Sequence, residues 1–418
     1  MPNREEMEVG ITEGARNGPT MQDFVTPRLP LQKRILFTGA AILLGWMLVE
    51  ALLHILTYFG VMPYLPTVTP SCYTKETVKF KIDRYGCPIF VDGHKVYRQI
   101  GMPAKLLLLD SEGYRPIDAQ RFGSSDYKIA FFGDSYTEGL QVDDLETFPR
   151  LIEKGLRQIG KHTICFNFGI GGTGTYHQYL RYLTASQETY LDDVVLCFLP
   201  QNDVLNNHEK LGKPFELPGV PYMVIRDGEF VGQHSDADTV HANQQLIWLR
   251  ATIGTSFVAT GMYRFWIRWK TNAKKRKMAV WETRTRWLGV YGPPLNDDWR
   301  EAWAITEEML LRFAGAARER NSRFTLVIVA DSLQITDSTL LDPELASTCD
   351  FEYPNRRLKE FCKKHGIVCL DSLPFFLKKK PTLDYPYFSW KHDGHYSQVG
   401  HQTMAAFLNA TDRFAGFR

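Results

Sequence analysis

The sequence predicts an α/β domain, a parallel sheet covered by helices on both faces, preceded by one membrane-spanning helix. Three observations predict this fold class. From Lys128 onwards, short apolar runs alternate with segments of helical periodicity. Glycine-rich or polar turns follow several of these runs. Near the N-terminus, residues 35–62 form a long apolar run that only Glu50 and His54 interrupt.

The composition is that of a globular protein without a strong charge bias. The 418 residues are 44% hydrophobic and 23% charged, and the formal net charge is +2. This length predicts several folding units, or one domain with large insertions. So small a net charge argues against a nucleic-acid partner bound through bulk charge.

The apolar run at 35–62 is long enough to cross a bilayer, because about 20 helical residues span the hydrocarbon core. A buried core helix would show a polar face, and a signal peptide would have a shorter polar lead and a small-x-small cleavage site. We therefore expect an uncleaved anchor. Lys33 and Arg34 precede the run, and the next cation is Lys75. The positive-inside rule then places the N-terminus in the cytoplasm and the C-terminal domain outside, in the periplasm or cell exterior of a bacterium.

Glu50 and His54 lie four residues apart within this run, so they share one helix face. Ionisable groups at membrane depth usually face protein or water, which would imply a partner membrane protein on the Glu50/His54 face. Alternatively, both side chains lie near the outer interface and extend into water.

The segments on either side of the anchor differ in character. Residues 1–34 are polar and lack periodicity, so we expect a disordered cytoplasmic N-terminus. Residues 63–124 contain turn signals such as Tyr85-Gly86 and Asp92-Gly93, and we expect a linker or small β-rich region there.

The main domain is expected at 125–418, with five strand-like apolar runs: KIAFFG, TICFNF, VVLCFL, FTLVIV and GIVCLD. A single terminal helix is expected at 397–416. An insertion at about 204–299 interrupts the alternation and contains the basic aromatic segment 262–278. That segment is either a cap or an anion-binding surface, or, as we favour, an amphipathic helix packed on the domain.

Seven cysteines are present. Cys165 and Cys197 lie within apolar runs and are expected to be buried thiols. In an oxidising compartment Cys72 could pair with Cys87, and Cys349 with Cys362 or Cys369; the pairing stays open. No spacing typical of a metal site occurs.

Polar or glycine-rich turns follow three successive runs. Ser135, at a strand-to-helix turn, would expose its hydroxyl and aim its N–H at a developing oxyanion. Asp-Ser at such a turn is also an ordinary N-cap, and for this turn taken singly the cap interpretation is favoured. The segment 167–175, NFGIGGTGT, has four glycines, which allow close backbone approach. Asn202, in PQND, could supply an amide donor or form an Asx turn.

The segment HDGHYSQVGH at 392–401 holds three histidines. A neutral His395 near Ser135 would accept the hydroxyl proton, and Asp393 would orient the ring. His392 is a rival by spacing. His401 falls inside the expected terminal helix and ranks last.

In combination and in this chain order, these segments resemble the SGNH (GDSL) hydrolase superfamily, in its membrane-anchored bacterial form. GDSYTEG at 133–139 is similar to the first sequence block of that family, the glycine run to the second, QND to the third and DGHYSQVGH to the fifth. The resemblance covers about residues 109–418. It implies a three-layer α/β/α sandwich with a five-stranded parallel sheet.

The resemblance also implies roles: Ser135 as nucleophile, His395 and Asp393 completing a catalytic triad, and Ser135 N–H, Gly172 N–H and the Asn202 side chain as oxyanion donors, without cofactor. Two positions depart from the family pattern. Pro200 replaces the glycine usual two places before Asn202, and Asp393 stands only two residues before His395.

The expected activity is hydrolysis of acyl esters, with acetyl esters of glycans or lipids as substrates. Transfer of acetyl to a polysaccharide, and a non-catalytic role in a larger membrane complex, remain as alternatives.

Overall fold

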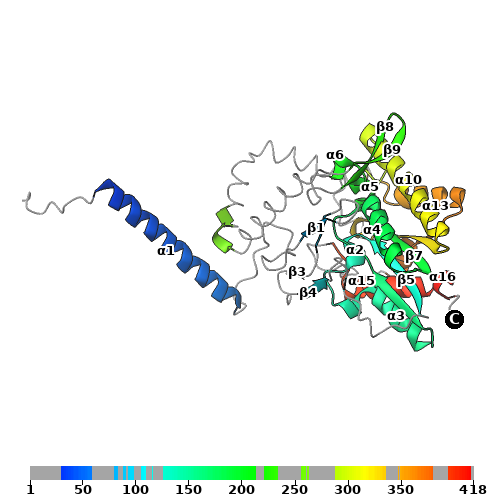
Figure 1. Ribbon diagram of the computed structural model, residues 1–418, viewed down its shortest axis with the longest axis horizontal. Helices are drawn as coiled ribbons and strands as arrows, with labels where there is room; N and C mark the ends of the chain where they lie inside the picture. Colours follow the sequence, from blue (N-terminus) through cyan, green and yellow to red (C-terminus); the bar gives the residue numbers. More distant parts are fainter. Residues whose placement is uncertain are drawn as a thin grey trace, which may run out of the picture. The chain divides into compact units, whose positions relative to one another are not determined.

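The protein is described by a computed structural model with two compact units, residues 1–59 and 60–418 (Figure 1). The structure describes residues 30–58, 80–82, 88–90, 93–97, 105–109, 115, 126–212, 221–233, 256–259, 261–262, 288–335, 347, 349–379 and 394–415. Residues 1–29 of the predicted disordered N-terminus, the basic aromatic segment after Met262, Cys72, Cys87, His392 and Asp393 lie outside these residues. For residues 31–34 the prediction of disorder is wrong, because they are helical.

The first unit contains α1, Leu31–Tyr58, a single apolar helix drawn in blue in Figure 1. Its Leu31–Leu56 portion is long and apolar enough to cross a membrane. The helix begins at Leu31 rather than at Ile35, so the two basic residues that precede the apolar run belong to its first turn. His54 Nε2 lies 3.2 Å from Glu50 Oε1, which confirms that the two side chains share one face.

Four short strands precede the main domain. β1 (Phe80–Ile82) pairs antiparallel with β2 (Pro88–Phe90). β3 (Gly93–Tyr97) pairs antiparallel with β4 (Lys105–Leu109). Both pairs lie within the predicted linker region, while the predicted domain boundaries stay predictions.

A five-stranded, fully parallel sheet forms the centre of the second unit. Its strands are β5 (Tyr127–Gly133), β6 (Thr163–Asn167), β7 (Asp193–Phe198), β10 (Arg323–Ile328) and β11 (Val368–Asp371), in the order β11-β10-β7-β5-β6. The five predicted strands are thereby confirmed. β6 and β7 lie on opposite sides of β5, and sheets of this kind hold their sites at such a switch point, beyond the carboxyl ends of the strands.

Helices cover both faces of the sheet, which confirms the three-layer sandwich. Successive strand residues point to opposite faces, so Ala130 and Phe132 join one core, and Ile129 and Phe131 join the other. The first core is closed by α4 (Thr175–Glu188), α10 (Asp297–Glu319) and α13 (Tyr353–His365). The second is closed by α3 (Phe148–Gln158), α14 (Leu373–Lys379) and α15 (Gln398–Asn409). Because both faces are covered, the strands are apolar almost throughout.

The predicted insertion begins with regular structure: α5 (Pro200–Asn206), α6 (Glu209–Gly212) and a hairpin of β8 (Tyr222–Arg226) and β9 (Glu229–Gln233). Asp227 and Gly228 both have positive φ, 52° and 81°, as a two-residue hairpin turn requires. Met223 packs with Tyr176 of α4 and Met309 of α10, so the hairpin covers these two helices.

The prediction of one continuous terminal helix is wrong. α15 ends at Asn409, and a separate turn, α16 (Asp412–Ala415), follows. The change of direction lets Phe414, 2% exposed, stack on Phe131 with ring centroids 6.3 Å apart. Burial of this ring in the core outweighs the continuation of a regular helix.

Cys165 and Cys197 are free and buried, as predicted. Cys362 and Cys369 are also free thiols in this structure, so neither pairs with Cys349.

Close packing of the glycine loop predicts a stability difference between two Gly→Ala variants. A Cβ added to Gly169 would lie 2.3 Å from the backbone nitrogen of Glu138, whereas one added to Gly155 in α3 would lie 3.6 Å from Asn409 Nδ2, the nearest atom outside its own helical turn. We expect Gly169→Ala to lower the free energy of unfolding by about 1–3 kcal/mol. Gly155→Ala should raise it by about 0.5–1 kcal/mol through helix propensity. Urea unfolding of both variants beside the wild type checks the pair; equal effects would contradict the packing argument.

Candidate active site

The first polar turn at the carboxyl edge of the sheet follows β5. There α2 (Ser135–Glu138) begins, and Asp134 caps it by accepting a hydrogen bond from the Tyr136 N–H at 2.9 Å. The cap role is thus taken by Asp134. Ser135 keeps its hydroxyl for another partner and is partly exposed to solvent.

That partner is His395. Its Nε2 lies 2.8 Å from Ser135 Oγ, although 260 residues separate the two in the chain. If Nδ1 carries the ring proton, Nε2 accepts the hydrogen bond from the serine hydroxyl, the arrangement required of a general base. Two predicted site residues are therefore brought into direct contact. Asp393 lies outside the described residues, and its role stays a prediction.

Two tyrosines that the sequence did not point to hold the His395 loop. Tyr136 donates its hydroxyl to the Gly394 carbonyl at 2.6 Å, and its ring centroid lies 5.2 Å from that of His395. Tyr396 donates to the Ala330 carbonyl at 2.7 Å. The residues before and after His395, Gly394 and Tyr396, are thus each held by a hydrogen bond. The position of Tyr136 directly after Ser135, the predicted nucleophile, was the only sequence signal for this contact.

The glycine loop after β6 lies against Ser135. Its backbone is tied to the first turn by a hydrogen bond from the Ile170 N–H to the Gly133 carbonyl at 3.0 Å. A Cβ added to Gly171 would lie 3.3 Å from Ser135 Cβ. Gly172 has φ of 74°, a left-handed conformation that favours glycine, and its missing side chain leaves open space. The predicted oxyanion donor, the Gly172 N–H, therefore belongs to the residue that directly follows Gly171, the glycine packed against Ser135.

Asn202 lies in the first turn of α5, close to Asp134. Its Nδ2 donates to Asp134 Oδ2 at 2.8 Å, which leaves the second N–H of the amide for another acceptor. Pro200, which departs from the family pattern, is the first residue of α5, where the missing N–H would have no helical partner in any case. The departure is accommodated without loss of a hydrogen bond.

Asp134 is a buried carboxyl that sequence reasoning did not single out. Burial raises its pKa to about 6, and the hydrogen bonds from Tyr136 N–H and Asn202 together with the nearby His395 only partly offset this. The buried carboxyl of Glu138 adds to the upward shift. Burial, followed by the nearby charge of Asp134, also raises the pKa of Asp203. Asp203 accepts hydrogen bonds from Leu199 N–H at 2.7 Å and from Gln178 at 2.8 Å.

His401, the lowest-ranked rival, is a structural residue. It is fully buried, stacks on Phe148 and accepts a hydrogen bond from the Phe148 N–H at 3.3 Å. Burial lowers its pKa to about 3, so the ring is neutral over the whole physiological range.

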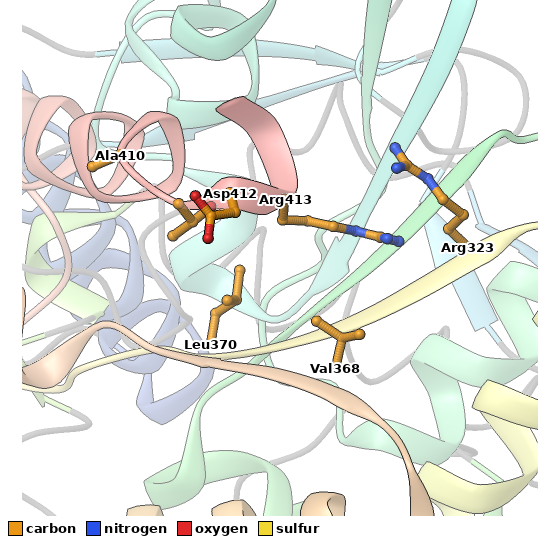
Figure 2. A pocket seen from close by; sticks show the side chains of 7 residues that line it. Arg323, Val368, Leu370, Ala410, Asp412 and Arg413 are labelled. Atoms are coloured by element: carbon orange, nitrogen blue, oxygen red, sulfur yellow. The ribbon is translucent and has the colours of Figure 1, made fainter. Parts of the chain in front are cut away.

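A cavity of about 640 Å³ lies at the other end of the sheet (Figure 2). It is lined by Arg323 and Val368, at the amino ends of β10 and β11, and by residues around α16 such as Arg413. Both arginines bind the buried carboxylate of Asp193. The cavity is therefore remote from the carboxyl edge where Ser135 and His395 meet.

Asp331, which follows β10 near the histidine loop, predicts a pH effect on stability. It is fully buried and accepts hydrogen bonds from the Tyr291 hydroxyl at 2.6 Å and from the Leu333 N–H at 2.8 Å. Burial raises its pKa to about 6, so the folded state binds this proton more tightly than the unfolded chain does. The resulting stability is present below about pH 4 and is lost as pH rises through 6.

Asp331→Asn removes this titration. The free energy of unfolding of the variant, minus that of the wild type, should rise by about 2–3 kcal/mol between pH 4 and pH 7. Urea unfolding at both pH values measures the difference. The titration of Asp134 contributes equally to the stability of both proteins and therefore cancels. A difference that stays constant with pH would contradict the assignment.

The chain matches no protein-family model and no curated relative. Solved structures that it resembles include TesA, at 13% identity with a TM-score of 0.36, over 67% of this chain and 95% of that one. Another is an acetylxylan esterase from Geobacillus stearothermophilus, at 15% identity and a TM-score of 0.38, over 71% and 97%. A third is a lipolytic protein of the G-D-S-L family from Veillonella parvula, at 13% identity and a TM-score of 0.36, over 69% and 100%. At such values the likeness decides neither the fold nor the activity, which have to be argued from the sheet and the Ser135–His395 contact.

Proposed function

We propose that this chain is a serine ester hydrolase of the SGNH type, anchored to the cell membrane by α1 and acting outside the cytoplasm. Its substrates would be acyl esters, with acetyl esters of glycans or lipids as the favoured class. The observation that supports this most strongly is the 2.8 Å contact between Ser135 Oγ and His395 Nε2 at the carboxyl edge of the sheet.

In the proposed reaction Ser135 Oγ attacks the ester carbonyl while His395 Nε2 accepts its proton. The ester C–O bond then breaks, and His395 returns the proton to the leaving alcohol. Water attacks the acyl-enzyme in the same way, which releases the acid and restores Ser135. Asp393 would orient His395 throughout.

The negative oxygen of each tetrahedral intermediate needs donors on the opposite side from His395. Ser135 N–H, Gly172 N–H and the second N–H of Asn202 Nδ2 are the proposed donors. Asp134 supports this arrangement because it accepts a hydrogen bond from one N–H of the Asn202 amide and so fixes the direction of the other N–H.

Covalent labelling tests the nucleophile directly. The detergent-solubilised full chain would be treated with a fluorophosphonate probe, and the modified peptide identified by mass spectrometry. We expect the label on Ser135. The untreated protein should release acetate from p-nitrophenyl acetate and from acetylated xylan. Failure of the folded protein to react at Ser135 would count against the proposal.

Measuring acetate release with and without a glycan acceptor separates hydrolysis from transfer. Acetate released into solution indicates a hydrolase, whereas acetyl groups recovered on the acceptor indicate a polysaccharide O-acetyltransferase. Both reactions share the acyl-enzyme, so the distinction rests on which hydroxyl attacks it.

The orientation proposed for α1 follows from Lys33 and Arg34 at its N-terminal end. Protease treatment of spheroplasts that express the full chain with a C-terminal epitope tests it. The epitope should be lost from intact spheroplasts, and its survival there would reverse the proposed topology.

The Glu50–His54 pair favours a second candidate, a non-catalytic subunit of a larger membrane complex. An ionisable pair within an apolar helix is costly to expose to lipid. This candidate predicts co-purification of another membrane protein, loss of that protein in the Glu50→Leu/His54→Leu variant, and no esterase activity in the wild type.

A further inference from the structure

Two consecutive glycine amides lie near the nucleophile, and the structure gives them different surroundings. The Gly171 N–H donates to Glu138 Oε2 at 3.0 Å. Within the residues that the structure describes, the Gly172 N–H takes part in no hydrogen bond. We propose that Glu138 is a positioning residue, which binds the Gly171 amide and thereby fixes the loop so that the Gly172 amide is the one presented to the substrate oxyanion. This inference rests on the proposed function.

The glycine loop has little freedom to take another position while this bond is made. A Cβ on Gly171 would lie 2.9 Å from Glu138 Oε2 and 3.3 Å from Ser135 Cβ, so this glycine fits between the carboxylate and the nucleophile. The next residue, Gly172, then turns into the left-handed conformation at φ of 74°. The start of the loop is tied by the Ile170 N–H to the Gly133 carbonyl, and Glu138 Oε2 holds the Gly171 amide that immediately precedes Gly172.

Glu138 is itself held firmly. Its side chain is almost fully buried, with the residue 4% exposed, and its N–H donates to the Asp134 carbonyl at 2.9 Å. Its carbonyl accepts two hydrogen bonds from the Arg115 guanidinium, at 3.0 Å and 2.7 Å, and Arg115 also binds the Gly139 carbonyl at 2.8 Å. Arg115 is 7% exposed, so its charge lies in the same buried region as the carboxylate and compensates it.

The role assigned to Glu138 depends on the reach of its acceptor atom, and three substitutions separate reach from charge. Glu138→Gln keeps an acceptor oxygen at the same distance and removes the charge. Glu138→Asp keeps the charge and withdraws the oxygen by one methylene. Glu138→Leu removes both with little change in volume.

We expect Glu138→Gln to keep kcat within about threefold of the wild type, and the Asp and Leu variants to lose about 10- to 100-fold, because a donor misplaced by about 1 Å can cost that much. KM should change little, since the donor acts on the transition state. Affinity for a boronic acid that mimics the tetrahedral intermediate should fall in parallel with kcat/KM.

Three outcomes would overturn the inference: an active Asp variant beside an inactive Gln variant, equal activity in all three, or a loss that appears in KM alone. If the Leu variant fails to fold, as judged by urea unfolding, the comparison of Gln with Asp still decides. The proposed function fails separately, if Ser135→Ala retains wild-type activity or if the wild type has none.

Discussion

Ser135→Ala is expected to lower kcat for ester hydrolysis by about 10⁴- to 10⁶-fold, the range that loss of an activated serine produces in other serine hydrolases. In the proposed reaction Ser135 Oγ forms the covalent bond to the acyl group, and its proton passes to His395 Nε2, which lies 2.8 Å away. Initial rates with p-nitrophenyl acetate over a range of concentrations measure the effect.

His395→Ala should cost nearly as much, and the double variant should be no worse than either single one. The two residues act as one unit, so their effects are not additive. Multiplicative losses would show that Ser135 and His395 do not share a step. Ser186→Ala, in α4, and His162→Ala, on the surface, are matched controls expected to keep wild-type rates.

Asn202→Ala should lower kcat by about 10²- to 10³-fold with a much smaller change in KM, as removal of one oxyanion donor does elsewhere. The amide is fixed before the substrate arrives, because one of its hydrogens is bound to Asp134 at 2.8 Å. The other hydrogen therefore needs no reorganisation when charge develops on the carbonyl oxygen.

Asn202→Asp extends this test. It keeps the shape of the side chain but places a second carboxylate against buried Asp134, so we expect a loss at least as large as that of Asn202→Ala near pH 8. Unfolding curves for both variants separate misfolding from lost catalysis. A wild-type kcat in folded Asn202→Ala would remove Asn202 from the proposed oxyanion site.

Strand positions were predictable because their signal is local. In TICFNF and VVLCFL almost every residue is apolar, and a short apolar run between helical segments predicts a strand covered on both faces. The end of a helix is less predictable. The break after Asn409 is set by the core position available to Phe414 beside Phe131, a contact between segments far apart in the chain.

The approach of Ser135 to His395 could also be anticipated, since each residue lies in a turn expected at the same edge of a parallel sheet. The contacts that fix this approach could not. Tyr136 and Gly394 are 258 residues apart, and Asp134 and Asn202 are 68 apart. The sequence does not show which of many possible hydrogen-bond partners a tyrosine or an aspartate in such a turn will have.

By itself, the sequence determined which five apolar runs form the central sheet, the turns that carry the polar residues, and the apolar helix α1, since each follows from the period and length of an apolar pattern. Only the tertiary structure decided that Asp134 and not Ser135 caps α2, that Glu138 binds Gly171 and that His401 is buried. These features depend on which side chains meet in the folded domain, and hydrogen bonds between distant segments produce no periodic pattern in the sequence.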